Sequence, residues 1–170
     1  MFSFAGYGGN SRKIIIRLEE DHCISPDELI PNISDFCASL EYSMGYFIAR
    51  RVMRGLEYAE NENFWPENAK KTLVVSGGVA SNLRLRHMLQ QACDQFDCQA
   101  VFPPVKYCTD NGVMIAWNGV EKWKRSREED IIPWQKVFDV DVYPKVPFGQ
   151  DISSVIASQQ LKAQKIKFNF

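Results

Sequence analysis

Two short segments hold the glycines and polar side chains that could bind a nucleotide and a cation. Residues 74–82 read VVSGGVASN, and residues 108–111 read CTDN. Both are typical of helix starts, where exposed backbone N–H groups bind anions. The carboxylate of Asp110 is the kind of ligand that a hard divalent cation prefers. The pair therefore indicates a nucleotide site with a cation beside it.

Each of these residues also has an ordinary structural explanation. Gly77 and Gly78 would let the backbone approach an anion or a sugar, but such pairs are also common in turns. Ser81 or Asn82 could cap the following helix, and the Asn82 amide could instead contact a ribose or a base. Asp110 could likewise be a helix cap. The residues alone leave both interpretations open.

The apolar pattern predicts a βαβα unit that would position both segments. Residues 73–76 and 99–102 are expected to be strands, and residues 82–96 a helix between them. A second helix is expected to open at Thr109 or Asp110. This order favours parallel pairing of the strands. The expected buried positions are Leu85, Met88, Leu89, Ala92 and Phe96 in the first helix, and Val113, Met114, Trp117 and Val120 in the second.

A long helix is expected before this unit. Apolar residues recur at steps of three and four from Ser34 to just before Asn61, with Ser34 as the N-cap and Asp35 in the first turn. The β-branched run at residues 13–18 predicts a strand or the start of a buried helix.

Three arginines crowd the C-terminal half of the long helix. Arg50, Arg51 and Arg54 would suit the negative end of the helix dipole. The alternative is that they contact the phosphates of an RNA. The second explanation would need a local patch, because the net charge of −1 gives no basic field over the whole chain.

The composition is that of one domain or one lobe. With 170 residues, 45% of them hydrophobic, the chain can form a core, and no apolar run is long enough to span a membrane. Five cysteines without a CxxC pair are expected to be reduced thiols of an intracellular protein. We expect a lobe at residues 1–145 and a poorly packed tail at residues 146–170.

Taken together, the motifs resemble the tRNA N6-adenosine threonylcarbamoyltransferases, also named O-sialoglycoprotein endopeptidases. Order and spacing match as well as residue type, and residues 144–153 are similar to the mitochondrial-type members. The matching segments are residues 2–6 (FSFAG), 34–36 (SDF), 76–82 (SGGVASN), 85–86 (LR), 103–104 (PP), 108–111 (CTDN) and 114–116 (MIA).

The resemblance implies an α/β fold, the C-terminal lobe of an actin-like ASKHA (ribonuclease H-like) nucleotide-binding fold. It implies transfer of threonylcarbamoyl from its adenylate to N6 of the adenosine beside the tRNA anticodon. By motif position, Asp110 would bind one divalent metal ion of unspecified identity, and Asn82 would bind the adenylate. The pocket would be lined by Gly77, Gly78, Ser81 and Thr109. The implied partners are tRNA and threonylcarbamoyl-adenylate, the implied location is the mitochondrion, no membrane is expected, and a homodimer is left open.

The chain also departs from the family pattern. The family's two metal-binding histidines, four residues apart on a helix, belong to an N-terminal half outside these 170 residues, and residues 7–10 leave its LKT-like pattern. His22 and His87 do not replace them. We therefore expect a C-terminal lobe that is inactive alone. The alternative is a non-catalytic nucleotide- or RNA-binding module. A metalloprotease is disfavoured because the sequence contains no His/Glu arrangement that could activate a water. A sugar kinase is disfavoured because it would have no need of residues 108–111.

Overall fold

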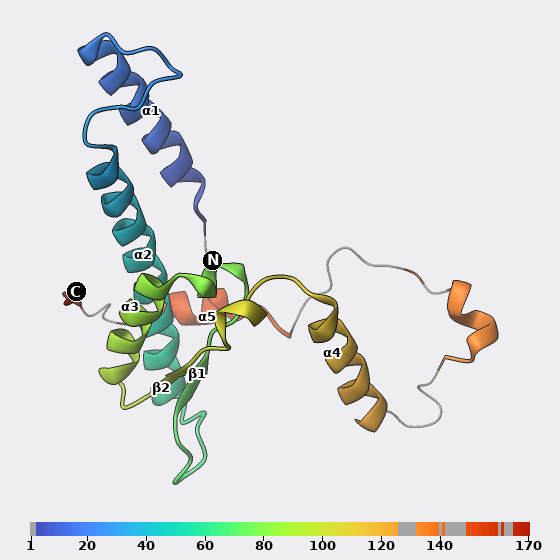
Figure 1. Ribbon diagram of the computed structural model, residues 1–170. Helices are drawn as coiled ribbons and strands as arrows, with labels where there is room; N and C mark the ends of the chain where they lie inside the picture. The colour runs from blue at the N-terminus through green and yellow to red at the C-terminus, as the bar shows by residue number, and fades with distance from the viewer. Residues whose placement is uncertain (1–2, 126–131, 140, 142–148, 160, 162–164) are drawn as a thin grey trace.

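The computed structural model describes residues 3–125, 132–139, 141, 149–159, 161 and 165–170. Two long helices lie side by side as an antiparallel hairpin, and the second continues into a small α/β unit (Figure 1). The α-helices are α1 (Ala5–His22), α2 (Ile33–Asn61), α3 (Leu83–Asp94), α4 (Gly112–Arg125) and α5 (Ser153–Ser158). The strands are β1 (Thr72–Val74) and β2 (Gln99–Val101), and short 3-10 helices are η1 (Gly78–Ser81), η2 (Val105–Tyr107) and η4 (Trp134–Asp139).

The two strands pair in parallel, as the sequence predicts. Leu73 lies opposite Ala100 and Val74 opposite Val101, and the Val75 N–H donates to the Val101 carbonyl at 3.0 Å. The order β1-α3-β2-α4 confirms the βαβα prediction. The fold is thus α/β with a short parallel sheet. Because parallel strands end at one edge, the loops after β1 and β2 both leave from that edge.

The core lies where α3 crosses α2. All five positions of α3 and its C-terminal extension that were predicted to be buried are buried. Gly45 of α2 permits the close contact, because a Cβ there would lie 2.6 Å from Sδ of Met88, which is itself 1% exposed. The core is formed by Ala49, Met53, Leu56, Leu85, Met88, Leu89, Ala92, Cys93, Phe96, Cys98, Ala100, Ile166 and Phe168.

Residues 165–170 pack against the helices, so the expected poor packing is wrong for them. Ile166 and Phe168 are buried in the core. The Asn169 carbonyl accepts from Gln91 Nε2 at 2.8 Å and lies 2.9 Å from His87 Nε2. The side chains of Ile166 and Phe168 are therefore part of the core. The predicted boundary at 145/146 falls outside the described residues, as do Phe2 and Pro144, and it stays a prediction.

The N-terminal predictions need two corrections. Residues 13–18 are part of α1, which has no buried residue, so neither the strand nor the buried helix is correct. Ser34 is not the N-cap, because α2 starts at Ile33 and Asn32 precedes it with φ 55° and no side-chain capping bond. Asp35 does lie in the first turn.

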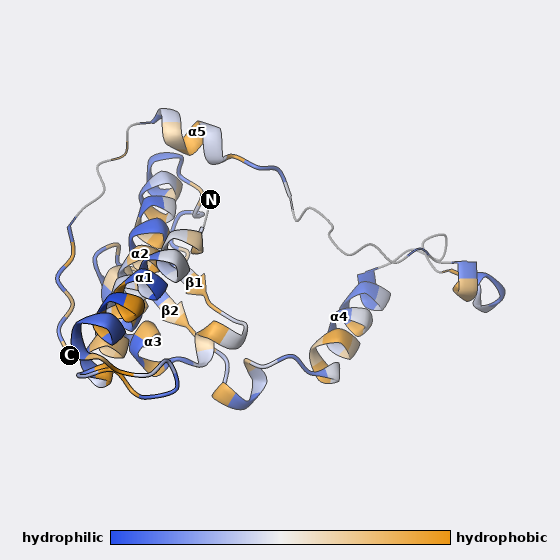
Figure 2. Ribbon diagram, turned by 90° about the horizontal axis from the view of Figure 1, so that it is seen from above, coloured by the Kyte–Doolittle hydropathy of each residue, from blue (hydrophilic) through white to orange (hydrophobic). Residues whose placement is uncertain are grey.

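Helix α4 also differs from the prediction. It stands apart from the core in both views, and the ribbon at its hydrophobic residues is orange in Figure 2. Trp117 is 61% exposed, and the other positions predicted to be buried are exposed too. An amphipathic sequence determines which face of a helix is apolar, but burial of that face needs a neighbouring element, and the described part of the chain leaves it exposed.

The five cysteines are all free thiols, which agrees with the prediction of no disulfide. Cys93, Cys98 and Cys108 are buried, whereas Cys23 and Cys37 are exposed. Within the described ranges, none of the helices is long and apolar enough to cross a membrane.

Candidate nucleotide-binding site

Both predicted segments lie at the carboxyl edge of the parallel sheet. The chain leaves β1 through residues 75–77 into η1, and it leaves β2 through residues 102–104 into η2. The two 3-10 helices contact each other. In open α/β sheets, ligands bind outside the carboxyl ends of the strands. The structure therefore places the two segments where a ligand would be expected.

Arg86 of α3 connects the two loops. Its Nε donates to the Ala80 carbonyl at 2.6 Å, and its Nη2 donates to the Pro103 carbonyl at 2.8 Å and lies 3.2 Å from Cys108 Sγ. The guanidinium also lies 5.2 Å from the centre of the Phe102 ring. One half-buried cation thus bonds to both loops at once. Sequence reasoning noted Arg86 only as part of a motif and missed this role.

The glycine turn has a backbone that only glycine adopts easily. Gly77 has φ 100° and ψ 172°, a region closed to side-chain-bearing residues. A Cβ added at Gly77 or at Gly78 would meet nothing within 4 Å. Ser81 Oγ donates to the Gly78 carbonyl at 2.6 Å and closes the turn. The backbone at both glycines is therefore open to an approaching ligand, whereas the proton of the Ser81 hydroxyl is already donated and only its oxygen can accept.

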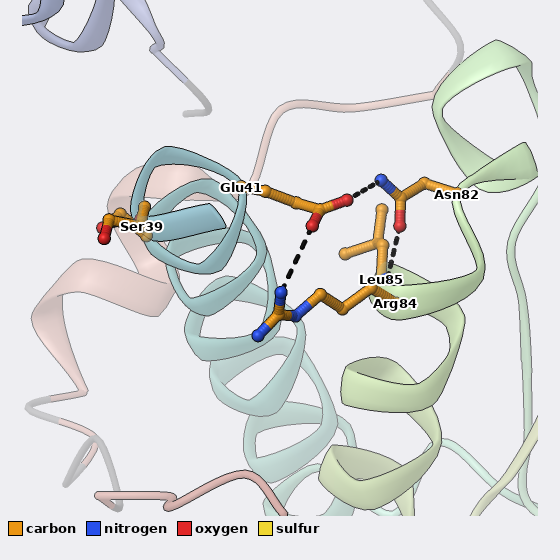
Figure 3. Close-up of polar contacts among 6 residues, drawn as sticks. Ser39, Glu41, Asn82, Arg84 and Leu85 are labelled. Carbon is orange, nitrogen blue, oxygen red and sulfur yellow. Dashed lines mark hydrogen bonds and ion pairs between the residues drawn. The ribbon is translucent and has the colours of Figure 1, made fainter. Parts of the chain in front are cut away.

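Asn82 joins the turn to both helices of the core (Figure 3). Its Oδ1 accepts from the Leu85 N–H at 2.8 Å, which confirms Asn82 as the N-cap of α3. Its Nδ2 donates to Glu41 Oε1 of α2 at 2.6 Å, and Arg84 Nη1 lies 3.5 Å from Glu41 Oε2. An amide has two donors and two acceptor lone pairs, so one of each remains for a ligand.

A mostly apolar pocket of about 270 Å³ opens beside Asn82, between α2 and α3. An apolar cavity with a few polar groups at its rim is the usual form of a small-molecule site. Glu41 and Asn82 supply those polar groups. Sequence reasoning missed both the pocket and Glu41, which interrupts the apolar face of α2. The remaining lining residues are Cys37, Leu40, Met44, Gly45, Ile48, Val79, Leu85 and Met88.

Thr109 and Asp110 lie exposed in the loop before α4. The cap of α4 is Asn111, whose Oδ1 accepts from the Met114 N–H at 3.1 Å, so the helix-cap interpretation of Asp110 is excluded. Among the described residues, the Asp110 carboxylate has no hydrogen bond or ion pair. It is therefore free to bind a cation or a donor group.

The donors on this chain do not make a complete metal site. No group of three or more His, Cys, Asp or Glu residues that could hold a metal is present in the part of the chain that the structure describes. A hard cation takes six or more oxygen ligands. Asp110 could supply one of them.

Comparison with known proteins identifies the family. The model of the tRNA N6-adenosine threonylcarbamoyltransferases matches residues 1–117. The chain belongs to this family. It is 35% identical over 166 residues to the mitochondrial transferase of Xenopus tropicalis and 31% identical over 166 residues to that of Homo sapiens. These alignments cover 98% of this chain but 40% and 39% of the relatives. The transferase of Rhizobium leguminosarum is 43% identical over 91 residues, which are 54% of this chain and 25% of that protein.

The chain thus spans about two fifths of the mitochondrial threonylcarbamoyltransferases that it matches. No solved structure matches it. Within this family member, the candidate residues fall into two groups. Gly77, Gly78, Ser81 and Asn82 form one continuous turn fixed to the core, whereas Thr109 and Asp110 lie in the second loop, joined to the first through Arg86 and Cys108.

Proposed function

We propose that this chain is the C-terminal, ASKHA-type lobe of a tRNA threonylcarbamoyltransferase. The lobe would bind threonylcarbamoyl-adenylate, whose acyl group is transferred to N6 of the adenosine beside the tRNA anticodon. The observation that supports this most directly is the Arg86 bridge. It joins the glycine turn and residues 103–108 at the carboxyl edge of a parallel sheet, in a member of the transferase family.

The adenylate would lie across the glycine turn. The open backbone at Gly77 and Gly78 suits close approach of a phosphate or a sugar. The apolar pocket beside Asn82 would take the base, and the remaining amide donor and acceptor of Asn82 would fix its orientation. Thr109 would line the same site from the second loop.

Asp110 would supply one ligand to a divalent metal ion. The described residues do not complete that metal site. Activity would then need groups beyond those described, so we expect the 170-residue chain to transfer no threonylcarbamoyl group to tRNA on its own. By analogy with its relatives, the protein would act in the mitochondrion on tRNA, and a homodimer stays open as its assembly.

The test is calorimetric titration of the chain with a stable threonylcarbamoyl-adenylate analogue, in the presence of Mg²⁺. Asn82→Ser keeps an N-cap but removes the amide, and Gly78→Ala adds a methyl group where the ligand would approach. Each should weaken binding about tenfold, as expected when about 1.4 kcal/mol of interaction is lost. Asp110→Asn should remove the dependence of binding on Mg²⁺.

The matched control is Gly55→Ala. Gly55 lies in α2, and an added Cβ there meets nothing within 4 Å, so this variant should bind like the unchanged protein. Equal affinities for all variants would exclude the glycine turn as the nucleotide site. If the chain binds the analogue but also transfers threonylcarbamoyl to tRNA, the expected inactivity is wrong. Binding without transfer agrees with both the lobe and the non-catalytic module.

A further inference from the structure

A second pocket, of about 400 Å³, lies between α1 and α2. It shares no residue with the glycine turn or the apolar pocket beside Asn82. Its composition is unusual, because half of its lining residues are cationic and the other half are aromatic. The residues are Tyr7, Tyr46, Phe47, Arg50, Arg51 and Arg54.

The helix dipole does not explain these arginines. α2 continues to Asn61, and its last turn contains no basic residue. The dipole acts on charges within the last turn, and Arg54 lies well before it. Arg50 and Arg54 are also four residues apart, a spacing at which like charges destabilise a helix. The sequence therefore keeps an electrostatically unfavourable arrangement at this place.

Within the described ranges, the protein supplies no acidic partner for the three guanidinium groups. Among the described residues, no side chain forms an ion pair or a hydrogen bond with Arg50, Arg51 or Arg54. Arg54 Nε is buried and lacks a hydrogen-bond partner within that same part of the chain. Arg84 Nε also lacks a partner there, but Nη1 of Arg84 lies 3.5 Å from a carboxylate oxygen of Glu41. A buried donor without a partner is costly, so the pocket calls for an acceptor from outside.

Aromatic rings hold two of the guanidinium groups in place. The Arg51 guanidinium lies 4.8 Å from the centre of the Phe47 ring, and that of Arg50 lies 5.8 Å from the centre of the Tyr46 ring. The Tyr7 hydroxyl donates to the Ser43 carbonyl at 3.1 Å, which ties α1 to α2 at the pocket. Tyr7, Tyr46 and Phe47 are half-buried. Arginines beside aromatic rings are groups that single-stranded nucleic acid binds, by phosphate contact and base stacking.

We propose that this pocket binds the phosphodiester backbone of a single-stranded RNA segment. The arginines would each pair with a phosphate oxygen, and a base would stack beside Tyr46. The choice of RNA rests on the proposed function, since the family acts on tRNA. The pocket itself would contact a part of the substrate RNA that is distant from the reacting adenosine.

The test measures binding of a fluorescein-labelled RNA hairpin to the purified chain by fluorescence anisotropy, over a range of salt concentrations. The triple variant Arg50→Gln, Arg51→Gln, Arg54→Gln should bind about tenfold or more weakly. The slope of log K against log salt should fall by about two, since each phosphate contact to a single strand contributes about 0.7. The charge-matched control replaces Lys122, Lys124 and Arg125 of α4 with glutamine.

Three outcomes would overturn the proposal. The triple variant of α4 could weaken RNA binding as much as the triple variant of Arg50, Arg51 and Arg54. RNA binding would then be explained by general charge attraction alone. Polyglutamate could displace the hairpin as well as unlabelled RNA does, which would indicate an acidic peptide as the ligand. Inorganic phosphate could do so at the same phosphate concentration, which would indicate a site for the free ion. The adenylate titration separates the two proposals, because the pocket triple should bind the adenylate analogue normally even where RNA binding is lost.

Discussion

Asn82 and Glu41, 41 residues apart, share a hydrogen bond of 2.6 Å that ties the glycine turn to α2. The same Asn82 side chain caps α3. The candidate site is thus attached to both helices of the core through one residue. Any change at Asn82 will act on stability as well as on binding, and the two effects must be measured separately.

Replacing Asn82 with alanine should lower the free energy of unfolding by about 1–2 kcal/mol, because α3 loses its cap and Glu41 loses a partner. Asn82→Ser should lower it by less, about 0.5–1 kcal/mol, since serine can also cap but leaves Glu41 without the amide donor. Urea denaturation of the two variants measures the difference. Equal destabilisation would mean that the cap contributes little and the bond to Glu41 dominates.

The two glycines of the turn should differ sharply in their tolerance of alanine. Gly77→Ala should cost about 1–3 kcal/mol, the strain of a side chain at φ 100° and ψ 172°. Gly78→Ala should change stability by less than about 0.5 kcal/mol, since its φ is not left-handed and the space is open. Thermal and urea unfolding of both variants test this, and similar losses would contradict the assigned conformation of Gly77.

Arg86→Met should destabilise the protein by about 2–3 kcal/mol, because the Ala80 and Pro103 carbonyls lose a charged donor. Hydrogen exchange should also become faster at residues 105–108, which Arg86 holds next to η1. Arg84→Met is the comparison, since its half-exposed ion pair should contribute about 1 kcal/mol or less. If Arg86→Met lowers the free energy of unfolding no more than Arg84→Met does, the bonds of Arg86 to the two loops do not stabilise the protein as proposed.

The thiols should react in two classes. Exposed Cys23 and Cys37 should be alkylated quickly at neutral pH, while Cys93, Cys98 and Cys108 should react only after unfolding. Burial, with a smaller effect of the neighbouring Cys98, raises the pKa of the Cys93 thiol to about 12. Mass spectrometry after a short iodoacetamide pulse would count the fast sites, and rapid labelling of Cys93 would contradict its burial.

The raised pKa of Cys93 also sets a pH dependence. The unfolded thiol loses its proton near pH 9, whereas the native thiol keeps it to about pH 12. Between these values the unfolded state binds fewer protons, so the free energy of unfolding should fall as pH rises. Urea denaturation from pH 8 to 10.5 should show a smaller decline in Cys93→Ala than in the unchanged protein.

Phe168 and Phe170 provide a matched pair for residues 165–170. Phe168→Ala should cost about 3 kcal/mol, as for other buried aromatic residues. Phe170 is 63% exposed, and Phe170→Ala should cost about 1 kcal/mol or less. Urea denaturation of both variants distinguishes a packed segment from a loose one. If Phe168→Ala lowers the free energy of unfolding only slightly, residues 165–170 are a poorly packed tail.

The sequence predicted the elements whose burial is decided locally. The helical spacing of Leu85, Met88 and Leu89 correctly predicted the buried face of α3. The strand-helix-strand order correctly predicted parallel pairing of the strands. Residues 13–18 were misread because their β-branched side chains favour a strand, yet they continue a helix that α2 supports. Helix propensity and context there outweigh strand propensity.

The connections within the site could not be predicted in this way. The bonds from Asn82 to Glu41 and from Arg86 to Pro103 join residues 41 and 17 positions apart. No periodic pattern encodes such contacts, since the first depends on how α2 and α3 cross and the second on how α3 lies against the loop after β2. For α4 the sequence defined the apolar face correctly, but it carried no information about which surface would cover that face.

The packing of residues 165–170 also determines when this fold can be completed during synthesis. Asn169 contacts Gln91 across 78 positions of the chain, and Phe168 closes a core whose other members belong mostly to α2, α3 and β2. Contacts this distant in sequence form late, because the intervening loop must first be ordered. A ribosome-bound chain that ends before Ile166 would therefore expose an open apolar groove, a state in which chaperones bind and aggregation begins.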